Sequence, residues 1–535
     1  MREWKGLDRL YEESEDEYIR LIEKHLENGG DINKNLLPCG PFETCDTGTI
    51  LIHAALNKSE KITKFVLDKD INIGAECLIA DYQFIPTEFE DEYRLRNALD
   101  VAIFHHSSNA SDSQAKNIYE MIKEKSLEKY ASYGLHQLHM ECGLGNWSEI
   151  EKYIHDPGML NKTIDIESPL WGGCSPLLVA TKFNRQEVAI RLIDLGASPK
   201  VRDTYAETPL HYLSFYEFCD KRLFIYDEED TFSRFSGMSH FHIACQFRSL
   251  DVVKKYLDQG VDPNLKTKIN KEGNSKDNTG LQFAGIVYIT HIPSADLAAL
   301  LLEYGAEVDE RYSGGFITSL PFYWKASIDP NMAEYVCILL EAYPDRADAW
   351  IDIFSTWIKN TINLSVRLTF LRSVIRIKVL HEDLVTEKLN ECANECLEIL
   401  LEEIDDENEF DAYYYYLCCM KELRQLKGLG LLWELRDLPV MQDFKQNFGT
   451  LVGSPTLIEN FPIYGRLLKI RLRNRLVKYE KQRRIVNKAL PYIIFVFKQL
   501  CNLPVVCAEK ILWNLNCDEL STFIELFSTN ATENF

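Results

Sequence analysis

The chain has 535 residues, an ordinary apolar content and a formal charge of −23. Its length exceeds one ordinary hydrophobic core, so we expect several domains or one elongated repeat array. The acidic balance disfavours nucleic acid as the partner of the whole molecule.

Cysteine usage and hydropathy restrict the compartment. The 15 cysteines follow no regular framework, which indicates free thiols in a reducing environment. The most apolar run, residues 489–497, is too short to span a membrane and contains Pro491. The first residues lead into an acidic amphipathic helix rather than an apolar leader. We therefore predict a cytoplasmic or nuclear protein with no signal peptide, transmembrane segment or membrane partner.

Short helix-start signatures recur along residues 1–345. The clearest are Ser175-Pro176-Leu177, then Thr208-Pro209-Leu210-His211 33 residues later, then residues 239–244 with His242 and Ala244. Earlier and weaker copies end at residues 26–33 or begin at Thr49 and Leu51, at 97–102 and at 136–139. Later ones fall at residues 279–284, 302–309, 318–320 and 332–343.

The residue types in this signature suit the start of a helix. Ser or Thr accepts a hydrogen bond from a free backbone N–H, and Pro needs no N–H at the first helical position. The pattern resembles the ankyrin repeat. The resemblance implies an all-α fold, a solenoid of about eight or nine helix-turn-helix units with β-turn loops, followed by a helical C-terminal domain. The histidines are expected to hydrogen-bond within and between loops, and insertions near 78–95, 212–236 and 266–277 are expected to be loops.

Motifs for enzyme chemistry are missing from the sequence. It contains no phosphate-binding loop, no nucleophile elbow, no His-Glu-x-x-His and no Cys-x-x-Cys pair. Cys392, Cys396, Cys418 and Cys419 allow either a zinc site or buried helix-packing thiols, and we favour packing. We predict no enzyme, no catalytic residue, no cofactor and no metal.

Long helices follow, without the Gly- and Asp-containing loop signature that separates ankyrin repeats. We expect a helical connector over residues 346–455. Residues 466–488 then carry ten basic residues, which are Arg466, Lys469, Arg471, Arg473, Arg475, Lys478, Lys481, Arg483, Arg484 and Lys488. Interleaved apolar residues predict an amphipathic helix, which could meet RNA, an acidic lipid surface or a partner helix. The interpretation that we favour is that the basic face of this helix is neutralised by the acidic stretch 402–411 of the same chain.

The last forty residues predict a short helical hairpin. Pro504 suits a helix start, and Cys507, Ile511, Leu512 and Leu515 form one apolar stripe. Asn516 and Glu519 then form a capping box for a second helix that carries Leu520. An apolar stripe on a terminal hairpin suits partner docking unless the helices before it cover the stripe.

This end resembles an F-box. Together with residues 461–464 it resembles the PRANC domain of poxvirus and parasitoid-insect ankyrin proteins, which we place at 456–535. The resemblance implies docking to a Skp-type adaptor of a cullin–RING ubiquitin ligase. The implied docking residues are Leu503, Pro504, Ile511, Leu512, Leu515, Glu519 and Leu520. Val506 occupies a position where the family usually has an acidic residue, and Glu519 replaces the family's aspartate. We expect no complete three-helix F-box in residues 503–535.

The leading hypothesis is a non-enzymatic adaptor whose ankyrin array binds a target protein and whose end recruits a ligase. A sequestering ankyrin scaffold without ligase recruitment is the alternative, in which the hairpin is a terminal cap. Binding of anionic lipid or RNA through the basic helix is a third hypothesis. The target itself has no signature in the sequence.

Overall fold

The structure of the chain is a computed structural model. The described residues are 14–34, 48–80, 93–109, 111–216, 218–226, 232–233, 236–268, 278–285, 294–308, 330–344, 364–381, 387–391, 394–395, 398, 412–429, 431, 456–500, 511–513, 515, 519–522 and 524. The expected repeat start at 318–320 therefore lies outside them.

The chain divides into two compact units. Unit 1 comprises residues 1–243 and 267–276, and unit 2 comprises residues 244–266 and 277–535. The helices of unit 1 are α1 (Glu15–Glu27), α2 (Ile50–Leu56), α3 (Glu60–Leu67), α4 (Ala98–Ser108), α5 (Ser113–Tyr130), α6 (Gln137–Leu144), α7 (Trp147–Ile150), α8 (Pro157–Leu160), α9 (Pro176–Lys182), α10 (Gln186–Asp194) and α11 (Pro209–Ser214). Helix α12 (His240–Gln246) begins in unit 1 and ends in unit 2.

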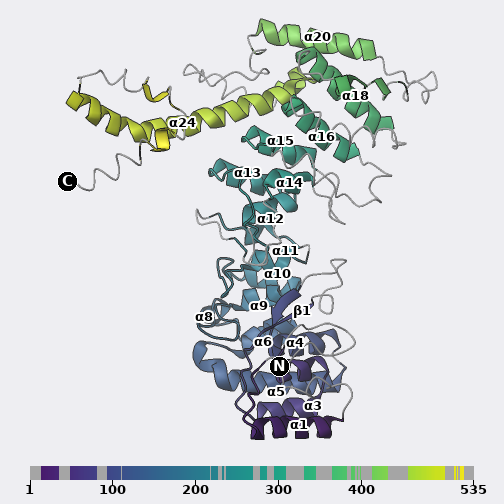
Figure 1. Cartoon of the computed structure of the whole chain (residues 1–535), viewed down its shortest axis with the longest axis vertical. Helices are drawn as coiled ribbons and strands as arrows, with labels where there is room; N and C mark the ends of the chain where they lie inside the picture. Colours follow the sequence, from purple (N-terminus) through teal and green to yellow (C-terminus); the bar gives the residue numbers. More distant parts are fainter. Residues whose placement is uncertain are drawn as a thin grey trace. The chain divides into compact units, whose positions relative to one another are not determined.

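Unit 1 is a stack of helix pairs (Figure 1). The first helices of successive pairs pack on one another in the order α2, α4, α6, α9 and α11. The second helices α3, α5, α7 and α10 each pack on the first helix of their own pair. The row of first helices buries a continuous core, because each pair has apolar faces that only its neighbours cover. The predicted all-α solenoid of helix-turn-helix repeats is confirmed.

A two-stranded antiparallel sheet interrupts the helices at the insertion expected near residues 78–95. Strand β1 (Cys77–Ala80) pairs with β2 (Tyr93–Arg96), and Cys77 lies opposite Arg96. The insertion thus contains a hairpin rather than only a loop.

The predicted Ser and Thr residues cap their helices. The side chains of Thr49, Ser175 and Thr208 accept from the backbone N–H three residues on, at 3.5, 3.2 and 3.4 Å. Pro176 and Pro209 occupy the first turn of α9 and α11, where a backbone N–H has no helical acceptor. Leu51, Leu177, Leu210 and Ala244 are buried.

Asparagine bridges link the ends of successive repeats. The Asn161 side chain accepts from the Ser198 N–H at 2.7 Å, and the Asn264 side chain accepts from the Glu307 N–H at 2.7 Å. Asn33 accepts from the Asn72 N–H at 2.6 Å in the same way. Each amide also donates to a carbonyl of the next repeat. These bonds fix the spacing of neighbouring units through backbone groups that would otherwise be unpaired.

Unit 2 continues with further helix pairs and then with longer helices. Its helices are α13 (Leu250–Asp258), α14 (Gly280–Gly285), α15 (Ala295–Glu303), α16 (Pro330–Ala342), α18 (Leu364–Leu380), α20 (Ala412–Gly428), α23 (Thr456–Asn460) and α24 (Gly465–Leu500). Helix α15 packs on α13, α14, α16 and α24, and the order α16, α18, α20 continues the stack.

One core joins the connector helices to the start of the C-terminal region. Its buried residues come from α18, α20, α23 and the first turns of α24, and they include Leu380, Cys419, Leu457, Tyr464 and Leu468. The segment 461–464, expected to belong to the terminal region, is therefore part of a core that α18 and α20 share.

Candidate partner-binding surfaces

His139, His211 and His242 cap the N-termini of the helices in which they lie. The Nδ1 atom of His211 accepts from the Thr208 N–H at 3.1 Å, and that of His242 accepts from the Ser239 N–H at 3.1 Å. His139 accepts from the His136 N–H in the same arrangement, at 3.2 Å. The opposite nitrogen of His139 lies 3.0 Å from the carbonyl of Lys162 in the following loop.

Burial favours the neutral form of the His139, His211 and His240 imidazoles. It lowers the pKa of His139 to about 4 and that of His240 to about 3, and it lowers the pKa of His211 well below its usual value. A neutral ring with Nδ1 as acceptor is the tautomer that the capping contact requires. The geometry is that of a structural hydrogen bond within the repeat.

A polar cavity of about 240 Å³ lies in unit 1 beside the loops that precede α9 and α11. Its lining includes Glu76, Trp171, Lys182, Asp203 and Tyr205. The Tyr205 hydroxyl donates to Glu76, and burial raises the pKa of both Glu76 and Asp203. Sequence reasoning missed this cavity, because its lining residues come from three segments that are far apart in the sequence, at residue 76, residues 168–182 and residues 203–205.

Behind the cavity lies a buried charged network. Lys182 and Asp100 form an ion pair at 3.3 Å, and the Trp171 indole N–H donates to Asp100 at 2.8 Å. Asp100 is fully buried and also accepts from the Asn97 N–H at 3.1 Å. These contacts connect the start of α4 with α9.

The terminal hairpin is described only in part, and it packs on the second half of α24. Leu512 and Leu520 are fully buried against Val486 and Ala489. Leu515 is half-buried, Glu519 is exposed, and Ile511 is 39 % exposed. Leu503 and Pro504 lie outside the described residues. Helix α24 therefore covers the part of the apolar stripe formed by Leu512, and Ile511 faces outward.

Polar and aromatic contacts hold the hairpin on α24. The Gln482 side chain donates to the carbonyls of Trp513 and Leu515, at 3.3 and 3.1 Å. The rings of Tyr479 and Trp513 stack with their centres 5.2 Å apart. Sequence reasoning missed these three contacts, although Gln482 breaks a run of basic residues and could have drawn attention.

The start of α24 is anchored by a carboxylate from α20. Glu422 accepts from the backbone N–H groups of Ile463 and Tyr464, at 3.1 and 2.7 Å. Tyr464 is fully buried, and its hydroxyl donates to the carbonyl of Arg376 at 3.2 Å. A carboxylate at this position satisfies the free N–H groups that precede a helix and complements the helix dipole.

The first half of α24 forms ion pairs with helices of the repeat stack. Arg466 binds Asp296 and Glu334, both at 2.7 Å. Lys469 binds Glu303 at 2.8 Å. Arg473 binds Asp258 at 3.4 Å. The acidic stretch 402–411, expected to neutralise the basic face of this helix, lies outside the described residues. The described acidic partners come from α13, α15 and α16.

Other site types have no support among the described residues. No group of His, Cys, Asp and Glu within this part of the chain could hold a metal ion. Cys419 is buried and Cys418 is half-buried, while Cys392 and Cys396 lie outside the described residues. No described helix is both long enough and apolar enough to cross a lipid bilayer.

Solved structures similar to this chain include an ankyrin repeat domain. The ankyrin repeat domain of human ASB11 aligns with 49 % of this chain and 86 % of its own length, at 14 % identity and a TM-score of 0.18. No protein-family model matches the chain, and a comparison with curated proteins gives no match.

Proposed function

We propose that the protein is a non-enzymatic adaptor. Its ankyrin array, residues 1–345, binds a target protein, and its C-terminal region, residues 456–535, recruits a Skp-type adaptor of a cullin–RING ligase. Residues 346–455 connect the two. The chain would raise the local concentration of target at the ligase, and the chemistry would belong to the ligase.

The observation that best supports recruitment is the exposure of Ile511. Among the described apolar residues from 511 to 524, it is the one classed as exposed, whereas Leu512 and Leu520 are completely buried on α24. A docking contact through this hairpin would therefore use Ile511 and the exposed Glu519. Leu512 and Leu520 would hold the hairpin in place rather than touch the adaptor.

Co-purification with a Skp-type adaptor tests recruitment. Ile511→Asp places a charge in the proposed contact, and Ile458→Asp is a matched control on α23, where Ile458 is 45 % exposed. We expect wild type and the Ile458 variant to retain the adaptor and the Ile511 variant to lose it. Equal recovery by both variants, or no recovery by wild type, would contradict the proposal.

A sequestering scaffold is the second candidate. The packing of Leu512 and Leu520 on α24 supports it, because a covered stripe suits a terminal cap as well as a docking element. In that case the array would still bind its target, and no ligase component would join the complex. Stable target levels in cells that contain the wild-type protein would favour this candidate.

A further inference from the structure

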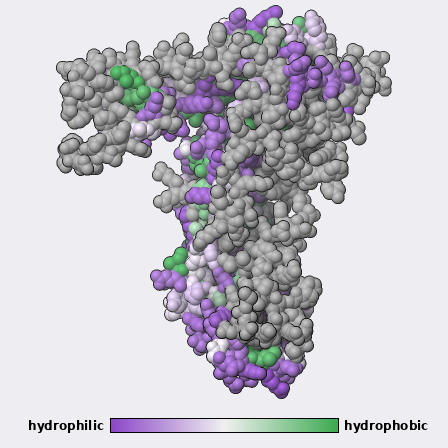
Figure 2. Space-filling model, in the orientation of Figure 1, coloured by the Kyte–Doolittle hydropathy of each residue, from purple (hydrophilic) through white to green (hydrophobic). Residues whose placement is uncertain are grey.

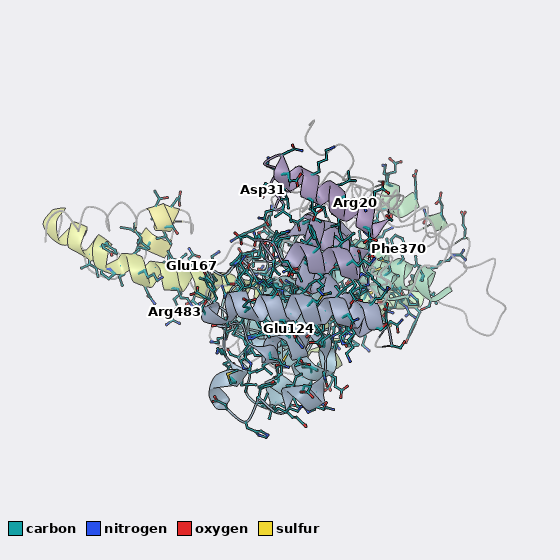
Figure 3. The ribbon with its side chains drawn as sticks, turned by 90° about the horizontal axis from the view of Figure 1, so that it is seen from below. Arg20, Asp31, Glu124, Glu167, Phe370 and Arg483 are labelled. Atoms are coloured by element: carbon teal, nitrogen blue, oxygen red, sulfur yellow. The ribbon has the colours of Figure 1, made fainter. Side chains whose placement is uncertain are left out.

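The two halves of α24 differ in what their basic side chains meet. Arg466, Lys469 and Arg473 in the first half pair with carboxylates of α13, α15 and α16. The second half extends beyond those helices, and Figure 3 labels Arg483 on this extended part. Its exposed basic residues are Lys478, Lys481, Arg483, Arg484 and Lys488, and none of them forms an ion pair with a described residue.

The unpaired cations continue the paired face of the helix. Arg466 and Arg484 are 18 residues apart, which is about five helical turns, so they lie on the same side. Lys481 and Lys488 flank Arg484 at spacings of three and four residues, which places them on that side as well. Figure 2 shows hydrophilic surface, drawn purple, over the middle of α24. The face that binds carboxylates in the first half therefore continues as an exposed basic face with no ion pair to the described residues.

Charge patterning makes this face unusual for the chain. From residue 465 to residue 488 the helix has ten basic residues and one acidic residue, Glu480, in a protein with a formal charge of −23. A helix whose only role was solvation would not need this concentration of one sign. Like charges spaced one turn apart repel each other, and a bound anion relieves that repulsion.

We propose that the face formed by Lys481, Arg484 and Lys488 binds an acidic segment of a partner protein, meaning a run of Asp and Glu carboxylates. The first half of the same helix shows the type of contact, with individual Arg and Lys side chains on carboxylates that neighbouring helices present. This surface is separate from Ile511 and does not depend on ligase recruitment.

Lipid and RNA fit the geometry less well. An amphipathic helix binds a bilayer through a free apolar face, but Val486 and Ala489 are buried under Leu512 and Leu520. Single-stranded RNA is held by stacking on free aromatic rings, but the Tyr479 ring is already stacked on Trp513. The protein partner needs only the exposed charges.

Fluorescence anisotropy with the full chain and a labelled 12-residue glutamate peptide tests the proposal. The test variant combines Lys481→Glu, Arg484→Glu and Lys488→Glu. The matched control combines Lys421→Glu, Arg424→Glu and Lys427→Glu on α20, where the same three residue types are exposed. A third variant with Gln at 481, 484 and 488 guards against misfolding of the reversed-charge protein, and circular dichroism checks each fold.

We expect wild type and the α20 control to bind the peptide in a salt-sensitive manner. The glutamate and glutamine variants of α24 should bind at least about tenfold more weakly. Absence of binding by wild type, or equal binding by all variants, would overturn the proposal. Tighter wild-type binding to a 12-nucleotide RNA or to phosphatidylserine vesicles, lost in both α24 variants, would overturn it in favour of that ligand.

Discussion

The guanidinium of Arg473 donates to the Tyr304 hydroxyl at 2.6 Å and lies over the same ring, 4.8 Å from its centre. The Tyr304 hydroxyl in turn donates to Asp258. One arginine of α24 thus contacts a tyrosine that follows α15 and an aspartate at the end of α13. This contact joins the C-terminal helix to the repeat stack of unit 2.

Removing the Arg473 side chain should loosen this junction. We expect Arg473→Gln to lower the free energy of unfolding by about 1–2 kcal/mol, because it removes both the hydrogen bond and the cation–π contact. Tyr304→Phe keeps the ring and should cost about 0.5–1.5 kcal/mol. Urea denaturation of both single variants and the double variant measures the coupling. Strictly additive losses would show that the two side chains do not interact.

We expect the Glu422 carboxylate to stabilise the start of α24. Glu422→Ala leaves the Ile463 and Tyr464 N–H groups without their acceptor, and we expect a loss of about 1–3 kcal/mol. Glu422→Gln retains an acceptor oxygen and should lose less. Thermal denaturation compares the two variants. The exposed Glu459 of α23 supplies the control, because Glu459→Ala should leave the midpoint nearly unchanged.

The buried pair of Asp100 and Lys182 gives a test in unit 1. Burial is the largest influence on the pKa of Lys182 and opposes its charge, but Asp100, Cys174 and Glu76 together outweigh it, so the pKa of Lys182 is raised. Asp100→Asn removes the carboxylate that forms an ion pair with this buried ammonium, so we expect a loss of about 3–5 kcal/mol. Adding Lys182→Met should recover part of the loss. If the double variant is no more stable than Asp100→Asn in urea, the charge is not the cause.

Stability should fall as the pH falls from about 6.5 to about 4. Burial lowers the pKa of His53 and His139 from 6.5 to about 4, so the unfolded chain binds more protons than the folded chain between these values. His139→Gln should fold at pH 7 and weaken this dependence, since Gln282 already accepts from the Thr279 N–H at the equivalent position, at 2.6 Å. Urea midpoints at pH 7 and pH 5 measure the effect. An unchanged difference between the two pH values would contradict the role of His139.

Two adjacent residues of the terminal hairpin should respond differently to truncation. Leu512→Ala removes a fully buried side chain from the cluster with Val486 and Ala489, and we expect a local loss of about 2–5 kcal/mol. Ile511→Ala removes an exposed side chain and should cost at most about 0.5 kcal/mol. Hydrogen exchange of residues 482–490 and 511–520 reports the opening. Equal exchange in the two variants would show that the hairpin is not packed on α24.

Much of the repeat fold could be predicted from local patterns. Thr208, Pro209 and His211 lie within one helical turn, so their capping contacts depend on neighbours in the sequence. The same holds for Ser175 and Thr49, which cap their helices as the residue types indicate. Helix starts and apolar faces depend on residues that are close in the sequence, so they can be predicted from the sequence.

The candidate surfaces could not be predicted in this way, because distant residues decide them. Arg466 and Asp296 are 170 residues apart, and Arg473 and Asp258 are 215 apart. Periodicity predicted a basic helix and an apolar stripe. It could not predict which basic side chains form ion pairs with carboxylates of other helices. The same limit applied to the hairpin, where the stripe included both Leu512 and Ile511.

The sequence alone therefore determined the repeat type, the capped helix starts and the basic character of α24. Only the tertiary structure decided that Leu512 is covered while Ile511 is exposed. It also decided that Arg473 forms an ion pair, whereas Arg484 forms none with a described residue. The physical reason is that burial and ion pairing depend on what lies within a few ångströms in space. Along this chain those neighbours come from helices that are far apart in sequence.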